Sequence, residues 1–400
     1  MSFENPRNIR NSWGLQSNFA NGPIAVNKLV PPIYSRIRTL FLQTWREQSV
    51  DSNLDFGQSN FVFTLPESLQ VISTAYLKID LPANNAGDYK AYPGLYVIDR
   101  FRLMSSGQEV YSCDYGLFLS DYCQSPTEEE LRHFANVYLG GSAASGDART
   151  ILLPLLLPNS TYLNRNGHDT RGHGVMPCYT ANNRIEIQLS INPATYCAAV
   201  AANPPGSISG ACSMLYHEVV MTDANLKTYA DQRSAYSIVT RRFTELTSGW
   251  THYAQANAVH RIHYAQPQGT VTELQFIAVA DDADESRHSL TARIQPSSIK
   301  VIADSVVQRS LDARYKIEIE DWTNGFKPPA DFPSPGRVCF ASHCSDDNTH
   351  MYTGGYNMSQ ASNITLEVVF GVACRFKVIA IQLQRVRMDA SGKLSSYLDS

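Results

Sequence analysis

The sequence predicts an all-β protein built from antiparallel sheets. Three observations point that way: apolar residues recur at every second position, long polar stretches separate these segments, and few segments carry a helical period. In residues 185–191, each odd-numbered residue is Ile or Leu, and each even-numbered residue is Glu, Gln or Ser. Side chains on a strand point alternately to opposite faces, so such a segment buries one face and exposes the other. Strands of a parallel sheet are apolar on both faces, so the pattern favours an antiparallel sandwich or barrel.

The alternating segments are spread along most of the chain. At 400 residues the chain is too long for one ordinary domain of about 150 residues. Residues 51–230 and 231–390 form two β-rich blocks of similar size, so we expect two β domains. The clearest alternating segments are residues 77–81, 185–191, 317–319, 364–370 and 379–383.

Two helices are expected. Residues 126–139 follow Ser125, which suits an N-cap, and Pro126 and Glu128 complete the signature of a helix start. Residues 223–231 come directly after a strand-like segment near the middle of the chain. We interpret this second, shorter helix as the connector between the two β blocks.

Long polar or small-residue stretches interrupt the strands. Loops of this length are unusual inside a compact domain and tend to carry surface function. They comprise residues 140–148, 158–174, 192–210 and 328–335.

The composition excludes several classes of protein. Hydrophobic residues make up 43% of the chain and charged residues 18%, which excludes general disorder. The formal net charge of −4 argues against a protein that binds nucleic acid through a broad basic surface. No apolar run approaches the roughly 18 residues needed to cross a bilayer. The N-terminus lacks the pattern of a secretory signal, so we expect the eight cysteines to be reduced thiols formed in a cytosolic environment.

The N-terminal 50 residues are predicted to form a basic arm. The first 48 residues contain six Lys or Arg and only two Glu, which gives this segment a net charge of +4. Ile33, Ile37, Leu40, Phe41 and Trp45 would share one face if this segment were helical.

Two interpretations of the arm remain open. It packs on the first domain, or it contacts a membrane surface or a protein of an inner layer. For the second interpretation the candidate contact residues are Arg36, Arg38, Phe41, Trp45 and Arg46.

No motif in the chain predicts catalysis. The sequence contains no phosphate-binding loop, dinucleotide-binding motif, nucleophile elbow, zinc-protease motif or EF-hand loop. The acidic run at residues 281–285 lacks the glycine that a calcium loop needs for its turn, so a solvated turn is the better interpretation. We therefore expect no catalytic residues and no cofactor.

Two groups of residues have side chains of the kind that bind metals. His260 and His263 lie three apart in a strand-like segment, where they would point to opposite faces and could not share an ion. Cys339 and Cys344 flank His343 but have no second pair at regular spacing. We therefore expect solvated or hydrogen-bonded histidines, buried thiols and no bound metal.

Segments in both halves resemble, in order, the double jelly-roll major capsid proteins of eukaryotic DNA viruses, the group that includes algal large DNA viruses, virophages and polinton-like viruses. Each segment alone is weakly specific, but no segment is out of order over residues 51–395. In the first half they are residues 96–110, with Gly107-Gln108 at a turn, and residues 114–119, 151–157, 184–191 and 214–220. In the second half they are residues 273–279, 333–341, 354–366, 376–386 and 391–394.

The resemblance implies two tandem eight-stranded antiparallel jelly-roll sandwiches with a few short helices. Their expected bounds are residues 51–230, including the linking helix, and 231–390, with a tail at 391–400. It further implies a major capsid protein whose homotrimers form pseudo-hexagonal tiles of an icosahedral virion shell. Assembly would take place in the host cytoplasm or nucleus.

The resemblance also implies partners. They are other copies of the chain in the lattice, penton and minor capsid proteins and, in some such viruses, an internal membrane, with no specific nucleic-acid binding. The loops at residues 140–148, 158–174, 192–210 and 281–288 would form outward-facing towers.

Two alternatives from other classes were weighed. A non-enzymatic, lectin-like β-sandwich that binds carbohydrate would share the alternation and the long loops. A β-sandwich hydrolase would need two carboxylates facing each other across a cleft, which a sequence alone does not reveal.

Overall fold

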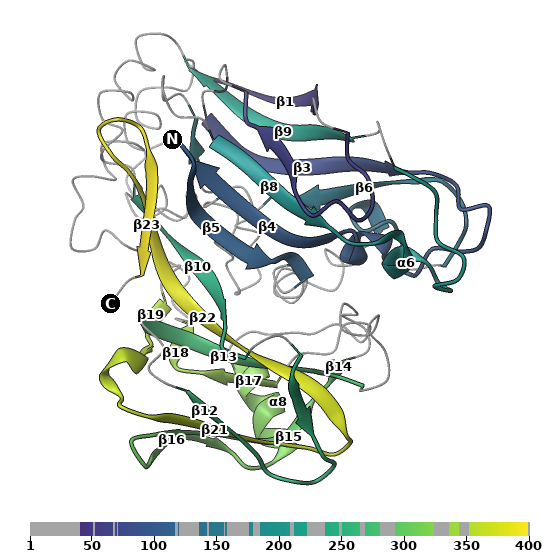
Figure 1. The fold of residues 1–400 in the computed structure, drawn as a ribbon. Helices are drawn as coiled ribbons and strands as arrows, with labels where there is room; N and C mark the ends of the chain where they lie inside the picture. Colours follow the sequence, from purple (N-terminus) through teal and green to yellow (C-terminus); the bar gives the residue numbers. More distant parts are fainter. Residues whose placement is uncertain are drawn as a thin grey trace, which may run out of the picture.

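The computed structural model confirms an all-β, antiparallel fold in the part of the chain that it describes (Figure 1). The strands of its sheets pair antiparallel, and between them lie only short helical segments. The described residues are 41–50, 53–66, 69, 71–116, 119, 136–141, 144–155, 157, 176–178, 185–208, 212–221, 237–247, 250–264, 269–280, 293–323, 336–343 and 352–398.

In the first half of the chain two sheets pack against each other. The strand order is β1-β9-β3-β6 in one sheet, where β7 also pairs with β3, and β2-β8-β4-β5 in the other. The strands are β1 (Phe41–Ser49), β2 (Phe61–Thr64), β3 (Val71–Leu81), β4 (Ile98–Ser105), β5 (Gln108–Asp114), β6 (Arg149–Pro154), β7 (Met176–Pro177), β8 (Ile185–Ile191) and β9 (Cys212–Met221).

The second half repeats this arrangement. One sheet has the order β10-β22-β13, with β17 and β14 on β13, and the other has the order β12-β21-β15-β16. The main strands are β10 (Ser237–Glu245), β12 (His260–Tyr264), β13 (Thr270–Val279), β15 (Pro296–Ala303), β16 (Val306–Leu311), β17 (Gly336–Cys339), β21 (Ile364–Phe370) and β22 (Cys374–Met388). The shorter ones are β11 (His252–Ala254), β14 (Arg293–Ile294), β18 (Ala341–His343), β19 (Tyr352–Gly354), β20 (Tyr356–Asn357) and β23 (Leu394–Leu398).

Both halves have the strand order of a jelly roll. If the eight main strands of each half are numbered along the chain, one sheet has the order 1-8-3-6 and the other 2-7-4-5. The four-stranded sheets β2-β8-β4-β5 and β12-β21-β15-β16 are therefore equivalent, as are the sheets that contain β1 and β10. The two β-rich blocks seen in the sequence are thus two copies of one topology.

The equivalence extends to irregularities in the sheets. An extra residue interrupts the pairing of the third strand with the eighth at Ser73 in β3 and at Thr272 in β13. Another interrupts the pairing of the fifth strand with the fourth at Val110 in β5 and at Gln308 in β16. A bulge fixes register because it shifts every later pair by one residue. The two halves can therefore be matched residue by residue near these points.

The first strands of the two halves are matched through these bulges. Trp45 in β1 lies opposite His217, and Phe243 in β10 lies opposite Ile381. His217 and Ile381 each lie, on their other side, opposite the first residue after the bulge in β3 or β13. Trp45 therefore corresponds to Phe243, and His217 corresponds to Ile381.

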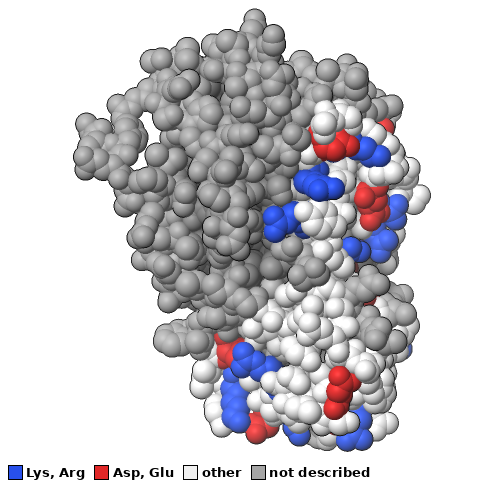
Figure 2. Space-filling view, turned by 90° about the vertical axis from the view of Figure 1, so that its left-hand side faces the viewer, with Lys and Arg blue, Asp and Glu red and all other residues white. Residues whose placement is uncertain are grey.

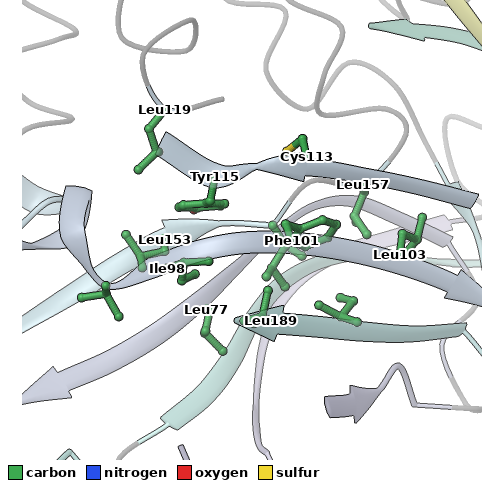
Figure 3. Close-up of a cluster of buried hydrophobic side chains, with 14 of the residues drawn as sticks. Leu77, Ile98, Phe101, Leu103, Cys113, Tyr115, Leu119, Leu153, Leu157 and Leu189 are labelled. Carbon is green, nitrogen blue, oxygen red and sulfur yellow. The ribbon is translucent and has the colours of Figure 1, made fainter. Parts of the chain in front are cut away.

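Alternating burial accounts for the two cores. In β8 every odd-numbered residue is buried and every even-numbered residue is partly exposed, as the sequence predicts. Figure 3 shows Leu77, Phe101, Leu153 and Leu189 meeting between the two sheets of the first jelly roll, and all four are at most 1% exposed. A second cluster, which includes Leu274, lies between the sheets of the second jelly roll.

The interpretation of residues 317–319 as part of a strand is wrong. They lie in helix α8 (Arg314–Thr323), where Arg314 forms an i,i+4 ion pair with Glu318. Ile317 is 1% exposed and Ile319 is 57% exposed. Residues two apart lie on different sides of a helix, so a pair of isoleucines with one residue between them does not distinguish a helix from a strand.

The expected helical segment at the end of the arm is also corrected. Phe41–Ser49 form strand β1, which pairs along its whole length with β9. Pairing with β9 satisfies the backbone polar groups of this segment, and this outweighs the weak helical pattern of its apolar residues. Residues 41–49 therefore belong to the first sheet of the first jelly roll.

At the other end, Leu394–Leu398 form β23, which pairs with β22, so these residues of the expected tail extend a sheet.

Several other expectations lie wholly or mostly outside the described residues. They concern the helices at residues 126–139 and 223–231 and the loops at residues 158–174, 281–288 and 328–335. The loop at residues 192–210 contains the short helix α6 (Ala194–Cys197). Among the described helices, none has the length and hydropathy of a membrane span.

Candidate functional site

The first candidate site is the junction of the two jelly rolls. Strand β5, at the edge of its sheet, lies close to β10 and β23 of the second jelly roll (Figure 1). An edge strand normally presents unpaired backbone groups and invites association. Here the second jelly roll lies against that edge.

Polar contacts join the two jelly rolls at this junction. Lys377 Nζ lies 2.8 Å from Asp114 Oδ2, and the Lys377 side chain is only 7% exposed. The ammonium group also lies 4.9 Å from the centre of the Trp250 ring. The side-chain amide of Gln384 donates to the backbone oxygen of Val110 at 3.0 Å. These contacts hold β5 in a fixed position on the sheet that contains β22.

Apolar side chains make the junction part of one continuous core. Phe243, Ile277, Ile379 and Ile381 all come from the second jelly roll, yet they pack in the same cluster as the core of the first. Burying a side chain of this size contributes about 1.5–3 kcal/mol. The two jelly rolls therefore form one unit with a desolvated junction.

The junction explains an unusual strand. Residues 271–279 of β13 are all buried, on both faces of the sheet. Leu274 and Phe276 point into the second core, whereas Ile277 belongs to the cluster of the first. The equivalent strand β3 alternates instead: Leu77 and Ile79 are buried, and Asp80 is exposed. The outer face of β13 is covered within the chain, and the outer face of β3 is partly open.

A charged group lies buried on the covered face of β13. Arg337 Nη1 lies 2.7 Å from Glu273 Oε1, and their side chains are 0% and 2% exposed. The side-chain amide of Gln275 donates to the same carboxylate oxygen at 2.8 Å. Since an unpaired buried charge is costly, this pair is a fixed structural element of the sheet.

The structure divides the five candidate contact residues of the arm. Arg36 and Arg38 lie outside the described residues, and of Phe41 only the backbone is described, at the first position of β1. Trp45 is 55% exposed on β1. Arg46 Nε lies 2.7 Å from Glu218 Oε2, and the Glu218 side chain is 5% exposed. Arg46 is thus bound to a buried carboxylate of its own sheet.

Aromatic side chains surround Trp45 on the outer face of the first sheet. The Trp45 ring centre lies 5.0 Å from that of His217 and 6.2 Å from that of Tyr76. Tyr76 in turn lies 5.2 Å from Tyr138. Beyond them Glu47 pairs with Lys78 at 2.8 Å. We call this surface, formed by Trp45, His217, Tyr76 and Leu215, the aromatic face.

A second open surface lies at the edge of the second jelly roll. The first five residues of β16 are exposed, although the equivalent strand β5 is covered. Next to it, helix α8 contacts β16 and exposes Tyr315 to 59%. We call β16 together with Tyr315 the open edge.

The residues weighed as metal ligands lie as the strand pattern predicts. His260 faces His252, with 3.4 Å between Nε2 and Nδ1, and packs against the Phe376 ring, whereas His263 meets Thr365 on the other side of the strand. His343 lies on β18, and Cys344 lies outside the described residues. Within the described ranges, no three His, Cys, Asp or Glu side chains gather as a metal site would require.

Of the six described thiols, five are buried and Cys212 is partly buried. Burial raises the pKa of Cys178 and of Cys197 to about 12, so neither thiol ionises near neutral pH. The free cysteines among the described residues are Cys113, Cys178, Cys197, Cys212, Cys339 and Cys374. None of these six forms a disulfide bond in the structure, and the reduced state of the thiols stays a prediction.

Charges are mixed over the described part of one face of the molecule. On the face shown in Figure 2, Lys and Arg side chains lie among Asp and Glu side chains.

Two of the expected tower loops meet at one end of the first jelly roll, since Tyr89 bridges to Ser145 and to Ala198.

Neither a protein-family model nor a curated protein matches the sequence. Solved structures do match the fold. The Faustovirus major capsid protein aligns with a TM-score of 0.63 at 10% identity, over 90% of this chain and 91% of its own. A quasi-atomic model of the PBCV-1 virus capsid aligns with a TM-score of 0.62 at 12% identity, over 91% and 98%. The mavirus major capsid protein aligns with a TM-score of 0.52 at 9% identity, over 90% of both chains.

These alignments extend over both jelly rolls and the junction between them. At such low identity they establish the fold and leave the function to be argued from the chain itself. The chain has the double jelly-roll fold of these viral major capsid proteins.

Proposed function

We propose that the protein is a major capsid protein, whose homotrimers form pseudo-hexagonal tiles in an icosahedral virion shell. The observation that carries this proposal is the fusion of two equivalent jelly rolls through a buried junction. Three copies of a chain with two similar lobes give six lobes in a ring, a shape that packs in a hexagonal lattice. A structural role of this kind requires neither a catalytic site nor a cofactor.

The solved structures support this proposal, because those cited are from viral capsids and align over nearly the whole chain. The mixed charge on the face shown in Figure 2 also suits a tile, since a large surface of one charge sign would oppose close packing of copies. The proposed location is the virion capsid, and the proposed partners are other copies of the chain, penton proteins and minor capsid proteins.

The basic segment before β1 has a separate proposed role. Residues 1–40 hold five of the six Lys and Arg of the expected arm, including Arg36 and Arg38. We propose that this segment contacts a minor protein or an anionic membrane beneath the shell. Arg46 forms an ion pair with Glu218 of its own sheet, but its side chain is 52% exposed, so it stays among the proposed contact residues.

Mass measurement and electron microscopy of the purified protein test the main proposal. We expect a species of three times the 44.4 kDa chain mass, seen as six-lobed tiles that form sheets or shells at high concentration. A protein that stays monomeric at high concentration, with no tiles in the images, would rule the proposal out. Binding to a glycan array with no self-association would favour the lectin-like alternative instead.

A further inference from the structure

The junction inside the chain joins an edge strand of one jelly roll to a sheet face of the other. The equivalents of these two surfaces are both exposed, the edge strand on the second jelly roll and the sheet face on the first. Within the chain, the edge strand β5 of the first jelly roll covers the outer face of the sheet that contains β10 in the second. The second jelly roll has an equivalent edge strand, β16, whose first five residues are exposed. The first jelly roll has an equivalent sheet face, the aromatic face, which is partly open.

The match holds at the level of single residues. Phe243 is 7% exposed because the first jelly roll covers it, whereas its equivalent Trp45 is 55% exposed. Ile381 is fully buried at the junction, and its equivalent His217 is only partly buried. The face that is covered in the second jelly roll is therefore the one that lacks a cover in the first.

The edge strands show the reverse asymmetry. Val110 of β5 is 1% exposed at the junction, and its equivalent Gln308 of β16 is exposed. Asp114, which binds Lys377 across the junction, corresponds to Asp312, which follows β16. The residue equivalent to Lys377 is Ser213 in β9.

We propose that the open edge of one copy binds the aromatic face of the next copy, in a contact that repeats the junction inside the chain. This inference rests on the proposed function, whose trimer it equips with an interface. The contact is heterologous, because one copy supplies the edge and the other supplies the face. Such contacts form a closed ring when the rotation between copies closes. If the rotation that relates the two jelly rolls of one chain equals the rotation that relates jelly rolls of adjacent copies, three copies complete a ring of six jelly rolls.

The chemistry of the two surfaces suits this contact. An exposed tryptophan flanked by other aromatic rings is the side-chain type most often found at the energetic centre of an interface. The open edge offers backbone groups of β16 together with the exposed Val306, Val307 and Tyr315. A second copy buries both surfaces at once and leaves neither exposed in the ring.

Chemical cross-linking tests the proposed pairing directly. A variant with both Ser213→Cys and Asp312→Cys should be linked by a short bifunctional maleimide into dimers and trimers, and into nothing larger, because the ring closes. The variant with Lys377→Cys and Asp114→Cys is the matched control, and it should be linked only within one chain. If the first double variant gives no linked oligomers while wild-type trimers form, the pairing is wrong and the capsid role is unaffected.

The single variants reveal the direction of the contact. Alone, Ser213→Cys and Asp312→Cys should each give no linked dimer, because in a heterologous contact each cysteine faces a different residue. Mixed and reassembled, the two should give linked dimers but no linked trimers. Linked dimers from either single variant alone would show a two-fold contact and overturn the proposal.

Substitution of Trp45 measures its contribution. We expect Trp45→Glu to raise the concentration at which trimers dissociate about tenfold or more, since a central tryptophan carries a large share of interface energy. Val372→Glu, at an equally exposed apolar position (51%), should leave it unchanged. Trimers of Trp45→Glu that dissociate as wild type does would overturn the proposal. If Trp45→Glu fails to fold, cross-linking of the cysteine pair decides the matter.

Discussion

Lys377 and Asp114 are 263 residues apart in the chain and form an ion pair of 2.8 Å between the two jelly rolls. The pair lies at the edge of a desolvated junction that includes Phe243, Ile379 and Ile381. One continuous core therefore spans both halves. The two jelly rolls are thereby held at a fixed angle, which the tile proposed above would require.

Removal of the carboxylate from this pair should weaken the junction. Asp114→Asn leaves the charge of the nearly buried Lys377 without its counter-ion, so we expect a loss of about 2–3 kcal/mol in the free energy of unfolding. The loss is below that for a fully buried pair because Asp114 is 35% exposed. Thermal unfolding followed by calorimetry measures it. Arg261→Met removes the exposed partner of Glu367 and leaves a carboxylate that water still reaches, so it should cost less than about 1 kcal/mol. Equal losses in the two variants would contradict this account.

The second jelly roll should lose stability in mild acid. Burial lowers the pKa of His252 and of His260, and the pKa of His260 is lowered further by the charge of His252. The unfolded chain then binds protons that the folded chain does not, so stability is complete above the unfolded pKa of about 6.5 and falls as the pH decreases below it.

A variant identifies the source of this pH dependence. His260→Phe introduces the residue found at the equivalent position of the first jelly roll, Phe61, and should flatten the loss between about pH 6.5 and 5. His217, whose pKa is also lowered by burial, should account for part of the remaining slope. Urea unfolding at a series of pH values gives the slopes. An unchanged slope in His260→Phe would show that other groups are responsible.

The two equivalent hairpins differ in turn chemistry. Between β4 and β5 the left-handed positions are Ser106 and Gly107, at φ 49° and 77°, and between β15 and β16 they are Asp304 and Ser305, at φ 47° and 67°. A residue other than glycine pays about 1 kcal/mol or more there. We expect Ser305→Gly to stabilise the protein by about 0.5–1 kcal/mol and Gly107→Ser to destabilise it by a similar amount. Paired denaturation curves test both signs, and a stabilising Gly107→Ser would contradict the argument.

Truncation separates the basic segment from the first strand. Deletion of residues 1–40 should leave the melting temperature and the trimer unchanged and reduce particle formation. Deletion of residues 1–48 also removes most of β1. Its backbone hydrogen bonds to β9 contribute on the order of 5 kcal/mol in total to the free energy of unfolding. We therefore expect the longer deletion to unfold at a clearly lower temperature. Normal particles from the shorter deletion would refute the role proposed for the arm.

The buried thiols should resist modification in the folded protein. Burial holds the pKa of Cys178 and Cys197 near 12, which leaves almost no thiolate at neutral pH. We expect iodoacetamide to leave both unmodified in native protein and to label both in urea, as peptide mass spectrometry would show. Rapid labelling of Cys197 without denaturant would mean that this part of the first jelly roll opens readily.

Much of the fold could be predicted from the sequence, because apolar and polar residues alternate along a strand that has one buried and one exposed face. The segment 185–191 and the other long alternating segments form strands for this reason, and the resemblance to double jelly-roll proteins implied the two jelly rolls. Short patterns were less informative. Ile317 and Ile319 suited a strand but lie in α8, and Trp45 suited a helix but lies in β1.

The candidate site was only partly predictable. The sequence drew attention to Trp45 and Arg46 as members of a basic, aromatic segment. It could not show that Arg46 is bound to Glu218 or that Trp45 is equivalent to the buried Phe243. A signal was present in β13, because its residues 276–279 are all apolar, whereas an antiparallel strand with one solvent-exposed face would alternate there.

By itself, the sequence determined the position of the longer alternating strands and which face of each is apolar, because these depend on the side chains of neighbouring residues. Only the tertiary structure decided which apolar faces are covered within the chain and which stay open. That outcome depends on contacts between residues hundreds of positions apart, such as Lys377 with Asp114, and on two bulges that set the register of the sheets. Local periodicity carries no information about either.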